Sequence, residues 1–247
     1  MKKIALIAGG LDDPVPGIAR ALAGAGYNVA LCGPHGPNAA APLLARLKSA
    51  GADAAYVQAD IARREDRFQL LQAVQRRFDG LHLLVHVPEL PAAGFSDPLE
   101  TDEETFLRTL RTVLHGPFFL TQAAARWMIE QREAYPAYRG LVIFVHPVGT
   151  QAGATASGTE AVMLAGLRAM AAAFASRLTA AGLFVREIEG PPLANSLGER
   201  TASAPTLGGP SDLLGRRVIE LAQSVFADAG EAVLRDHAAG PARRKGE

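Results

Sequence analysis

Three histidines and two glutamates are the residues whose types could carry acid–base or metal chemistry: His86, His115 and His146, with Glu89 and Glu160. An imidazole titrates near neutral pH, and a carboxylate beside it can orient it for proton transfer. The spacings match no established pattern of metal ligands, so no metal site is predicted. The simpler alternative is that His146 is a polar residue at a strand end and that Glu160 favours a helix start through the helix dipole.

The segments that must position these side chains alternate between short apolar runs and longer helical stretches. Strands are predicted at 4–8, 28–32, 54–58, 81–87, 141–145, 184–188 and 232–234. Helices are predicted at 17–26, 42–50, 63–78, 101–129, 161–181 and 213–226. Strands that alternate with helices form a parallel sheet covered on both faces. We therefore expect a single-domain, Rossmann-type doubly wound α/β fold over 1–240, with about seven strands in the order 3-2-1-4-5-6-7 and a short basic tail at 241–247.

The overall charge and the cysteine content limit the partners that the chain is expected to have. Lys+Arg and Asp+Glu both total 25, so we expect neither a nucleic acid nor an anionic membrane surface as partner. A single cysteine, Cys32, cannot form a disulfide within the chain, which favours a reducing compartment. No segment approaches the ~18 consecutive apolar residues of a membrane span. These features predict a cytoplasmic protein.

Five segments, in this order along the chain, carry a family resemblance. They are Gly17–Leu22, Ala59–Ile61, Asp79–Val85, Gly116–Ala123 and Val185–Leu193. Together they resemble the short-chain dehydrogenase/reductase superfamily, and in particular its β-ketoacyl-reductase-like members, over about residues 3–238. The resemblance implies a dinucleotide-binding fold and an NAD(P)-dependent oxidoreductase ancestry. It also implies that the cofactor would be contacted by Gly9, Gly10, Gly17, Ile18 and Asp60.

The catalytic residues implied by this resemblance are replaced. The positions of the family's Asn, Ser, Tyr and Lys fall on Val113, Pro147, Glu160 and Leu164. In the family, Tyr transfers the proton as hydride moves, Lys lowers the pKa of Tyr and holds the nicotinamide ribose, and Ser polarises the carbonyl. A general acid contributes about 10²–10⁴-fold to a rate. Leu164 can neither lower a pKa nor hold a ribose, and the helix predicted at 161–181 contains no tyrosine or lysine.

The cofactor motif implied by the resemblance is altered as well. The family places glycines four and six residues after the first, and counting from Gly9 these positions hold Asp13 and Val15. Asp12 and Asp13 would set negative charge beside the pyrophosphate, although the two acids also suit a turn and a helix N-cap. The family's Asn-Asn-Ala-Gly turn is replaced by residues 86–89, His-Val-Pro-Glu. We therefore expect no tightly bound cofactor, and NAD(P) if any binds.

Three functions follow from these features. The first is a degenerate member of the superfamily that lacks the usual NAD(P)-dependent ketone/alcohol reaction and acts as a structural or regulatory subunit. The second is a working oxidoreductase, similar to 3-oxoacyl reductases, with a diverged site in which His146 and Glu160 are weak substitutes for the lost residues. The third is a binding module that uses the altered pocket for a small ligand.

The expected partners are copies of the same fold. In the superfamily that the chain resembles, helices equivalent to about 102–131 and 161–181 form the face between subunits. Small residues in the second of these helices permit close helix approach. We expect a homodimer or homotetramer, or a hetero-oligomer with an active paralogue, assembled through these helices.

Overall fold

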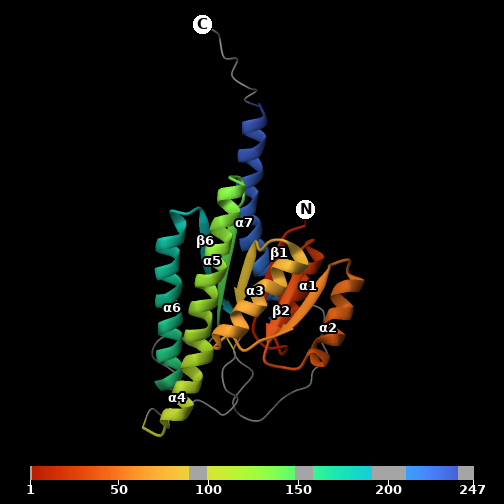
Figure 1. Cartoon of the computed structure of the whole chain (residues 1–247). Coiled ribbons are helices and arrows are strands. Elements are labelled where there is room, and N and C mark those ends of the chain that lie inside the picture. The colour runs from red at the N-terminus through yellow and green to blue at the C-terminus, as the bar shows by residue number, and fades with distance from the viewer. Residues whose placement is uncertain (1, 89–98, 148–157, 191–209, 239–247) are drawn as a thin grey trace.

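The computed structural model describes residues 2–88, 99–147, 158–190 and 210–238. In this part of the chain six strands form one sheet in the order β3-β2-β1-β4-β5-β6, and every pair is parallel (Figure 1). The strands are β1 (Ile4–Ala8), β2 (Asn28–Gly33), β3 (Ala54–Gln58), β4 (Leu83–His86), β5 (Gly140–Pro147) and β6 (Leu183–Gly190). The predicted doubly wound α/β fold is confirmed, with the first six strands in the expected order.

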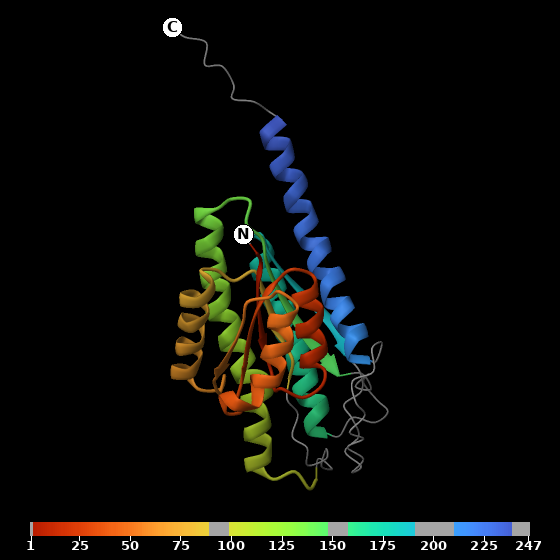
Figure 2. The ribbon, with the colours of Figure 1, turned by 90° about the vertical axis from the view of Figure 1, so that its right-hand side faces the viewer.

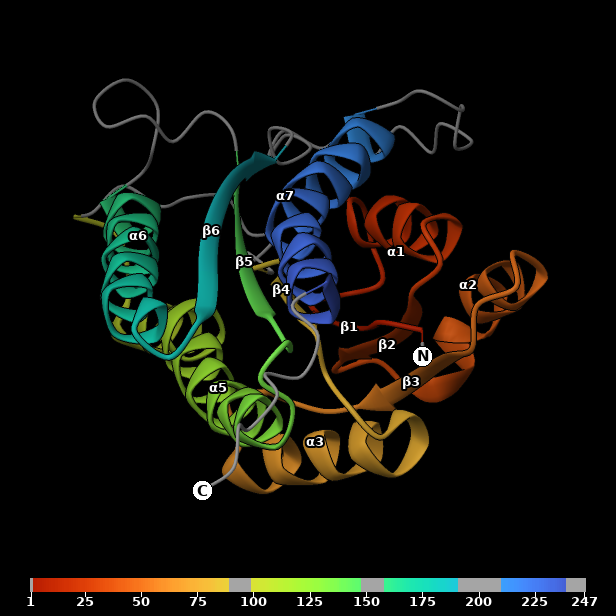
Figure 3. The ribbon, with the colours of Figure 1, turned by 90° about the horizontal axis from the view of Figure 1, so that it is seen from above.

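Helices cover both faces of the sheet (Figure 3). One face packs against α1 (Val15–Gly24), α2 (Pro37–Ser49) and α7 (Pro210–Ala238), and the other against α3 (Arg64–Phe78), α5 (Gly116–Ala134) and α6 (Gly158–Thr179). Successive side chains of a strand point to opposite faces, so Ile7 of β1 enters the first core and Leu6 the second. Both side chains are fully buried, which explains why the strands are apolar at every position.

The helix predicted at 101–129 is present but contains an irregular turn. It is divided into α4 (Glu103–Leu110), a π-helical turn η1 (Arg111–His115) and α5. Asp102 caps it, because its carboxylate accepts a hydrogen bond from the N–H of Thr105 at 2.8 Å, and this contact lowers the pKa of Asp102. Pro117 follows η1 and has no N–H to donate. The wider π turn ends at His115, two residues before Pro117, and lies where the proline ring would clash with an ordinary helix.

The seventh strand predicted at 232–234 is wrong. These residues continue α7, which extends well beyond the body of the domain (Figure 2). Glu231, Leu234 and their neighbours favour a helix, and no proline follows Pro210 within α7 to end it. A run of three apolar residues does not distinguish a strand from one turn of helix. The predicted tail at 241–247 lies outside the described residues.

The helix α6 is unusually apolar for a helix on the outside of a fold. The expectation that no segment approaches the length of a membrane span does not hold for this helix. Its segment Ala161–Thr179 is the one stretch of the described chain that is long and apolar enough to cross a membrane, and 33% of that window is buried. Helices in the core of soluble proteins can be equally long and equally apolar. Against η1, α6 packs closely at Gly166, where a Cβ atom would lie 2.7 Å from the side chain of Leu114.

Candidate functional site

A cavity of about 180 Å³ lies at the carboxyl edge of the sheet, the edge at which doubly wound folds bind ligands. Its walls come from the ends of β1 to β4 and from the η1–α5 segment. The lining residues are Ala8, Gly9, Cys32, Gly33, Pro34, Ala59, Asp60, Ile61, His86, Val87, Pro88, Thr112 and Pro117. Pro34 and Asp60 are exposed, so they mark the rim of the cavity.

The cavity exists because small side chains occupy one row of the sheet and leave space above it. Ala8 pairs with Cys32 of β2 and with His86 of β4, so the three side chains stand side by side on the face toward α3 and α5. Neighbouring strands are about 4.8 Å apart, which places Cys32 and His86 about 9–10 Å from each other. The methyl group of Ala8 fills little of the space between them. Ala59, at the end of β3, is equally small.

His86 is a buried histidine that lines this cavity. Its side chain is 1% exposed and stacks on Phe144 with ring centroids 5.0 Å apart at 15°. The Nε2 atom is hydrogen-bonded to the hydroxyl of Thr121 at 2.8 Å, whereas Nδ1 has no hydrogen-bond partner among the described residues. Burial lowers the pKa of His86 to about 3, so the imidazole is neutral at physiological pH. Nδ1 is therefore a fully buried polar atom that can accept or donate, depending on the tautomer.

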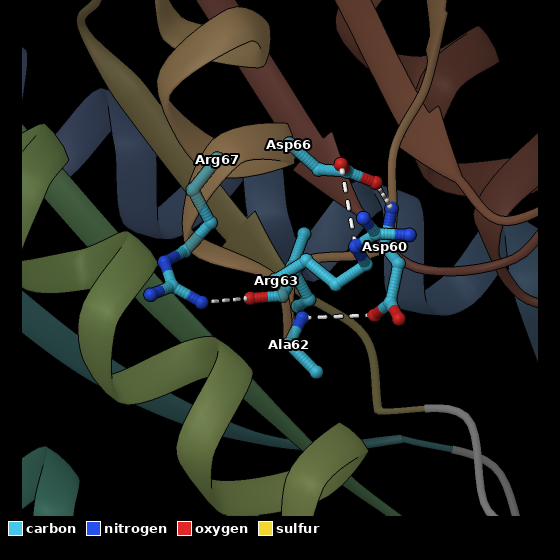
Figure 4. A network of polar contacts seen from close by, with 6 residues as sticks. Asp60, Ala62, Arg63, Asp66 and Arg67 are labelled. Carbon is cyan, nitrogen blue, oxygen red and sulfur yellow. Dashed lines mark hydrogen bonds and ion pairs between the residues drawn. The ribbon is translucent and has the colours of Figure 1, made fainter.

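Asp60 places a negative charge at the rim. Its N–H donates to Asp66 at 2.9 Å, and its carboxylate accepts from the N–H of Ala62 at 2.9 Å. Arg67 turns away from this carboxylate and donates to the carbonyl of Ile61 at 2.6 Å (Figure 4). The loop that follows β3 is thus held by its own hydrogen bonds. Among the described residues that line the cavity, Asp60 is the one with an acidic or basic side chain other than His86.

The first turn of α1 has no N–H group available to a phosphate. Pro14 and Pro16 have no N–H at all. The N–H of Val15 bonds to the carbonyl of Asp12 at 3.0 Å, and the N–H groups of Gly17 and Ile18 bond to the carbonyl of Pro14 at 3.1 and 3.2 Å. A helix N-terminus binds an anion through free N–H groups. In this structure the N–H groups of Val15, Gly17 and Ile18 are therefore not free to bind a phosphate.

The predicted cofactor residues separate into two groups. Gly9 and Asp60 line the cavity, and Gly10 is buried beside them at the end of β1. Gly17 instead faces α7, because a Cβ atom there would lie 2.6 Å from both Cβ and the carbonyl oxygen of Ser211. Ile18 is fully buried in the core beneath α1. The structure therefore gives Gly17 and Ile18 packing roles.

The N-terminus of α7 is fastened to α1. Arg20 forms a salt bridge with Asp212 at 2.8 Å, and the hydroxyl of Ser211 bonds to the carboxylate of Asp13. Gly215 continues the contact, since a Cβ atom there would lie 2.8 Å from the carbonyl oxygen of Gly17. Asp13, predicted to lie beside the pyrophosphate, is thus engaged with α7.

His146 and Glu187 meet at the other end of the carboxyl edge, on β5 and β6. The His146 side chain is 2% exposed, its Nε2 lies 3.5 Å from the Glu187 carboxylate, and neither ring nitrogen is hydrogen-bonded within the described chain. Burial, with a smaller effect of Arg168, lowers the pKa of His146 to about 4. Burial also raises the pKa of Glu187. The pair is therefore a neutral imidazole beside a carboxylate. The side chain of Glu160, the partner predicted for His146, lies outside the described residues.

Comparisons with known proteins agree with the fold described above. A family model described as enoyl-(acyl carrier protein) reductase matches residues 16–206, well over half of the chain. The chain belongs to the short-chain dehydrogenase/reductase superfamily. The resemblance drawn from the five sequence segments is thereby confirmed.

Solved structures of the superfamily share the fold of this chain over most of the chain's length. The NADH-dependent reductase A1-R′ complexed with NAD has a TM-score of 0.74 at 23% identity, covering 88% of this chain and 87% of that chain. A 3-oxoacyl-[acyl-carrier protein] reductase from Brucella melitensis has a TM-score of 0.69 at 26% identity, covering 77% and 76%. A short-chain type dehydrogenase/reductase from Mycobacterium marinum has a TM-score of 0.68 at 22% identity, covering 76% and 74%. No curated protein matches the sequence significantly.

The four positions assigned to the superfamily's catalytic residues lie along η1, β5 and α6. Val113 is fully buried in η1, and Leu164 is 3% exposed in α6. Pro147 is the last residue of β5 and Glu160 lies in the first turn of α6. The loop at 148–157 lies outside the described residues. The assignment of these positions stays a prediction.

Sequence reasoning missed Thr121 and Glu187. Thr121 is a single hydroxyl in a long, largely apolar helix, and only the packing of α5 against β4 brings it to His86. Glu187 pairs with Phe144 across β5 and β6, which puts its side chain in the same row as His86. That alignment follows from the strand order and register. His115 is not among the residues given as lining the cavity, and its ring contacts that of Phe119, with centroids 4.9 Å apart.

Proposed function

We propose that this chain is a non-catalytic member of the superfamily that acts as a structural or regulatory subunit. The observation that carries the proposal is the first turn of α1, whose N–H groups are either missing or bound to carbonyl oxygens of the same turn. A dinucleotide with its pyrophosphate at that turn would have to break these hydrogen bonds. It would also approach Asp12, which is exposed. We therefore propose that neither NADH nor NADPH binds tightly.

A second line of support is the chemistry of the residues assigned to the catalytic positions. Leu164 is buried, and its aliphatic side chain cannot supply a cation from that position. Val113 offers no polar atom. Loss of a general acid costs about 10²–10⁴-fold in rate, and loss of a group that stabilises the developing charge costs about 10²–10³-fold. A chain with both losses is expected to turn over ketones too slowly to serve as a reductase.

The subunit contacts that we propose involve α4, α5 and α6. Several large apolar side chains of these helices are exposed: Leu107 at 40%, Phe118 at 39%, Phe119 at 37% and Val162 at 53%. Phe118 touches both Phe119 and Phe174 of α6, so these rings form one patch. An apolar patch of this kind marks an interaction surface. We propose a homodimer, a homotetramer, or a hetero-oligomer with an active paralogue that buries this face.

The experiment is a turnover assay with NADH and NADPH against 3-oxoacyl thioesters and simple ketones. The reductase from Brucella melitensis named above serves as the active control under the same conditions. We expect turnover at least 10⁴-fold below that control, because two catalytic groups are lost. Turnover within tenfold of the control would refute the non-catalytic proposal.

A second candidate, an active oxidoreductase with a diverged site, is favoured by the contact between His146 and Glu187. A neutral imidazole 3.5 Å from a carboxylate could accept a proton during a reaction. This candidate predicts measurable turnover that falls at least tenfold in His146→Ala or in Glu187→Gln, and the same loss in Glu160→Gln if that residue takes part. Unchanged turnover in all three variants would exclude these roles.

A further inference from the structure

Two arginine side chains converge on one turn at the amino edge of the sheet, the edge opposite to the cavity. The turn joins the end of α5 to the start of β5 and lies at the edge where the chain begins (Figure 1). Nη1 of Arg132 donates to the carbonyl groups of Tyr138 at 2.8 Å and Pro136 at 3.4 Å. Nη1 of Arg139 donates to the same two groups, at 2.9 and 3.0 Å. The two guanidinium groups are therefore direct neighbours.

Neither guanidinium group has an acidic partner in the described part of the chain. The salt bridges found there involve other arginines and His146, and none involves Arg132 or Arg139. The carbonyl groups at the end of a helix, together with the helix dipole, can hold one cation. Here two cations share the same pair of carbonyl groups, and like charges at short distance repel each other. A bound anion would remove this repulsion.

Several N–H donors of the pair have no acceptor in the described chain. A guanidinium carries five N–H donors in a planar fork, and in both residues only Nη1 donates to another described residue. The buried polar side-chain atoms that lack a partner are all histidine nitrogens among the described residues, so solvent reaches Nε and Nη2 of Arg132 and Arg139. The pair is thus anchored through Nη1 and still accessible through its other nitrogens.

The turn that carries the pair is held in place by its own contacts. The N–H of Tyr138 donates to the carbonyl of Tyr135 at 2.8 Å, and the hydroxyl of Tyr138 donates to the carbonyl of Leu81. The guanidinium of Arg132 packs on Gly182, which has a φ of 68° and where a Cβ atom would collide with the guanidinium carbon. Groups that are positioned before a ligand arrives lose less conformational freedom when it binds.

The charge and shape of the pair match a phosphate monoester. Two guanidinium groups supply two positive charges, and a phosphate monoester carries about −1.5 to −2 charges at pH 7 with three acceptor oxygens. The planar fork of arginine binds such oxygens two at a time. A carboxylate carries one negative charge and would leave one cation unbalanced. Tyr135, which begins the turn, is 70% exposed and makes no ring contact in the described chain, so its ring is available to an organic group on the phosphate.

We propose that Arg132 and Arg139 form a binding site for a phosphate monoester, with the ring of Tyr135 beside its organic group. The site lies at the amino edge of the sheet, and it shares no residue with the cavity or with the contact of His146 and Glu187. The inference is therefore independent of the proposed function.

The test is calorimetric titration of the full chain with inorganic phosphate and with phenyl phosphate at low salt. We expect phosphate to bind with a Kd below about 1 mM. Arg139→Lys keeps the charge and loses the planar fork, so it should weaken binding at least about fivefold, and Arg139→Gln at least about tenfold. Arg126→Gln, at an exposed position of α5, is the matched control and should bind as the parent chain does. A Kd above about 10 mM, or equal affinities of the parent chain and Arg139→Gln, would overturn the inference.

A second comparison identifies the source of the phosphate group. Phenyl phosphate is expected to bind at least about threefold more tightly than inorganic phosphate, and Tyr135→Ala to abolish that difference. Equal affinities in the parent chain would overturn the role of Tyr135 and the ester, and would assign the pair to free phosphate. Arg132→Lys is expected to weaken binding as Arg139→Lys does, and unchanged affinity in that variant would remove Arg132 from the site.

The outcomes are separable from those of the proposed function. Turnover comparable to that of an active reductase would refute the non-catalytic proposal and leave the phosphate site standing. Absence of phosphate binding would overturn this inference alone.

Discussion

The carboxyl edge of the sheet has two regions that differ in what they retain. Over β1 to β4 it holds a cavity of about 180 Å³ whose described lining is mostly apolar and includes a neutral histidine and the carboxylate of Asp60. Over β5 and β6 it holds the contact of the buried His146 with the exposed Glu187, beside α6, in which Leu164 is buried. The first region has a shape that can take a ligand, whereas the second is marked by a polar pair, His146 and Glu187.

A cavity and a catalytic group place different demands on the sequence. The cavity needs only small side chains at strand ends, such as Ala8 and Ala59, and the register of a parallel sheet keeps them aligned. Catalysis needs particular groups at particular atoms, and under the proposed function leucine at position 164 supplies no such group. A fold can therefore keep its cleft after the chemistry is gone.

The largest expected effect is a loss of stability caused by a charge placed at a buried position of α6. Leu164→Lys places an unpaired charge in a site that is 3% exposed, and should lower the free energy of unfolding by roughly 3–5 kcal/mol. Thr179→Lys, at an exposed position at the end of the same helix, is the control and should change it by less than about 0.5 kcal/mol. Urea titration measures both. A stable Leu164→Lys protein that gains NADPH binding would show that this region still has the superfamily's cofactor geometry.

The next prediction concerns Gly17 and tests whether this residue is needed for helix packing or for ligand binding. A side chain at Gly17 collides with Ser211 of α7, so Gly17→Val should cost about 2–3 kcal/mol. The control is Gly24→Ala in the same helix, where a Cβ atom meets nothing within 4 Å and a small gain of stability is expected. Thermal melts report both variants. Unchanged stability of Gly17→Val together with altered nucleotide binding would contradict the packing role.

A third effect uses acid to probe the cavity wall. The unfolded chain binds a proton on His86 near pH 6.5, and the folded chain near pH 3. Stability is therefore constant above about pH 6.5 and falls as the pH drops toward 3, because protons favour the unfolded state. His86→Phe, which keeps a ring beside Phe144, should reduce the loss between pH 6.5 and 4.5 by on the order of 2 kcal/mol. Urea midpoints at both pH values measure this, with exposed His35→Gln as the control. An equal loss in parent and His86→Phe would mean that His86 is not buried as a neutral ring.

The smallest effect concerns the link between α1 and α7. The salt bridge of Arg20 with Asp212 is partly exposed, with side chains 31% and 20% accessible, so Arg20→Gln should cost only about 0.3–1 kcal/mol. The loss should shrink further at high salt. A measured cost above 2 kcal/mol would mean that α7 is held to α1 mainly by this pair, and that the close approach at Gly17 matters less than we infer.

The fold was predictable because its signals are local and repeated. Each of the first six strands is a short apolar run, and the intervening helices carry their own caps and breaks, as at Asp102. The error at 232–234 arose where the signal was only three residues long. The π turn before Pro117 was not predicted, because hydrogen-bond spacing within a helix leaves no pattern in the residue types.

The site was predictable only in outline. Asp60, Gly9 and His86 could be placed at the carboxyl edge because each follows or ends a strand. The closed first turn of α1 was not visible in the sequence, because it depends on which carbonyl each N–H finds. The role of Gly17 against Ser211 joins residues almost two hundred positions apart, and no local pattern reports such a contact.

The most direct test of the account is to follow the backbone N–H resonances of Gly17 and Ile18 by NMR while NADH is added. These N–H groups are bound to the carbonyl of Pro14 in the structure. We expect no change in their chemical shifts up to millimolar NADH, with any perturbation confined to residues of the cavity such as Gly9, Gly33 and Val87. Saturable shifts of Gly17 and Ile18 at micromolar NADH would contradict the claim that the pyrophosphate site is closed.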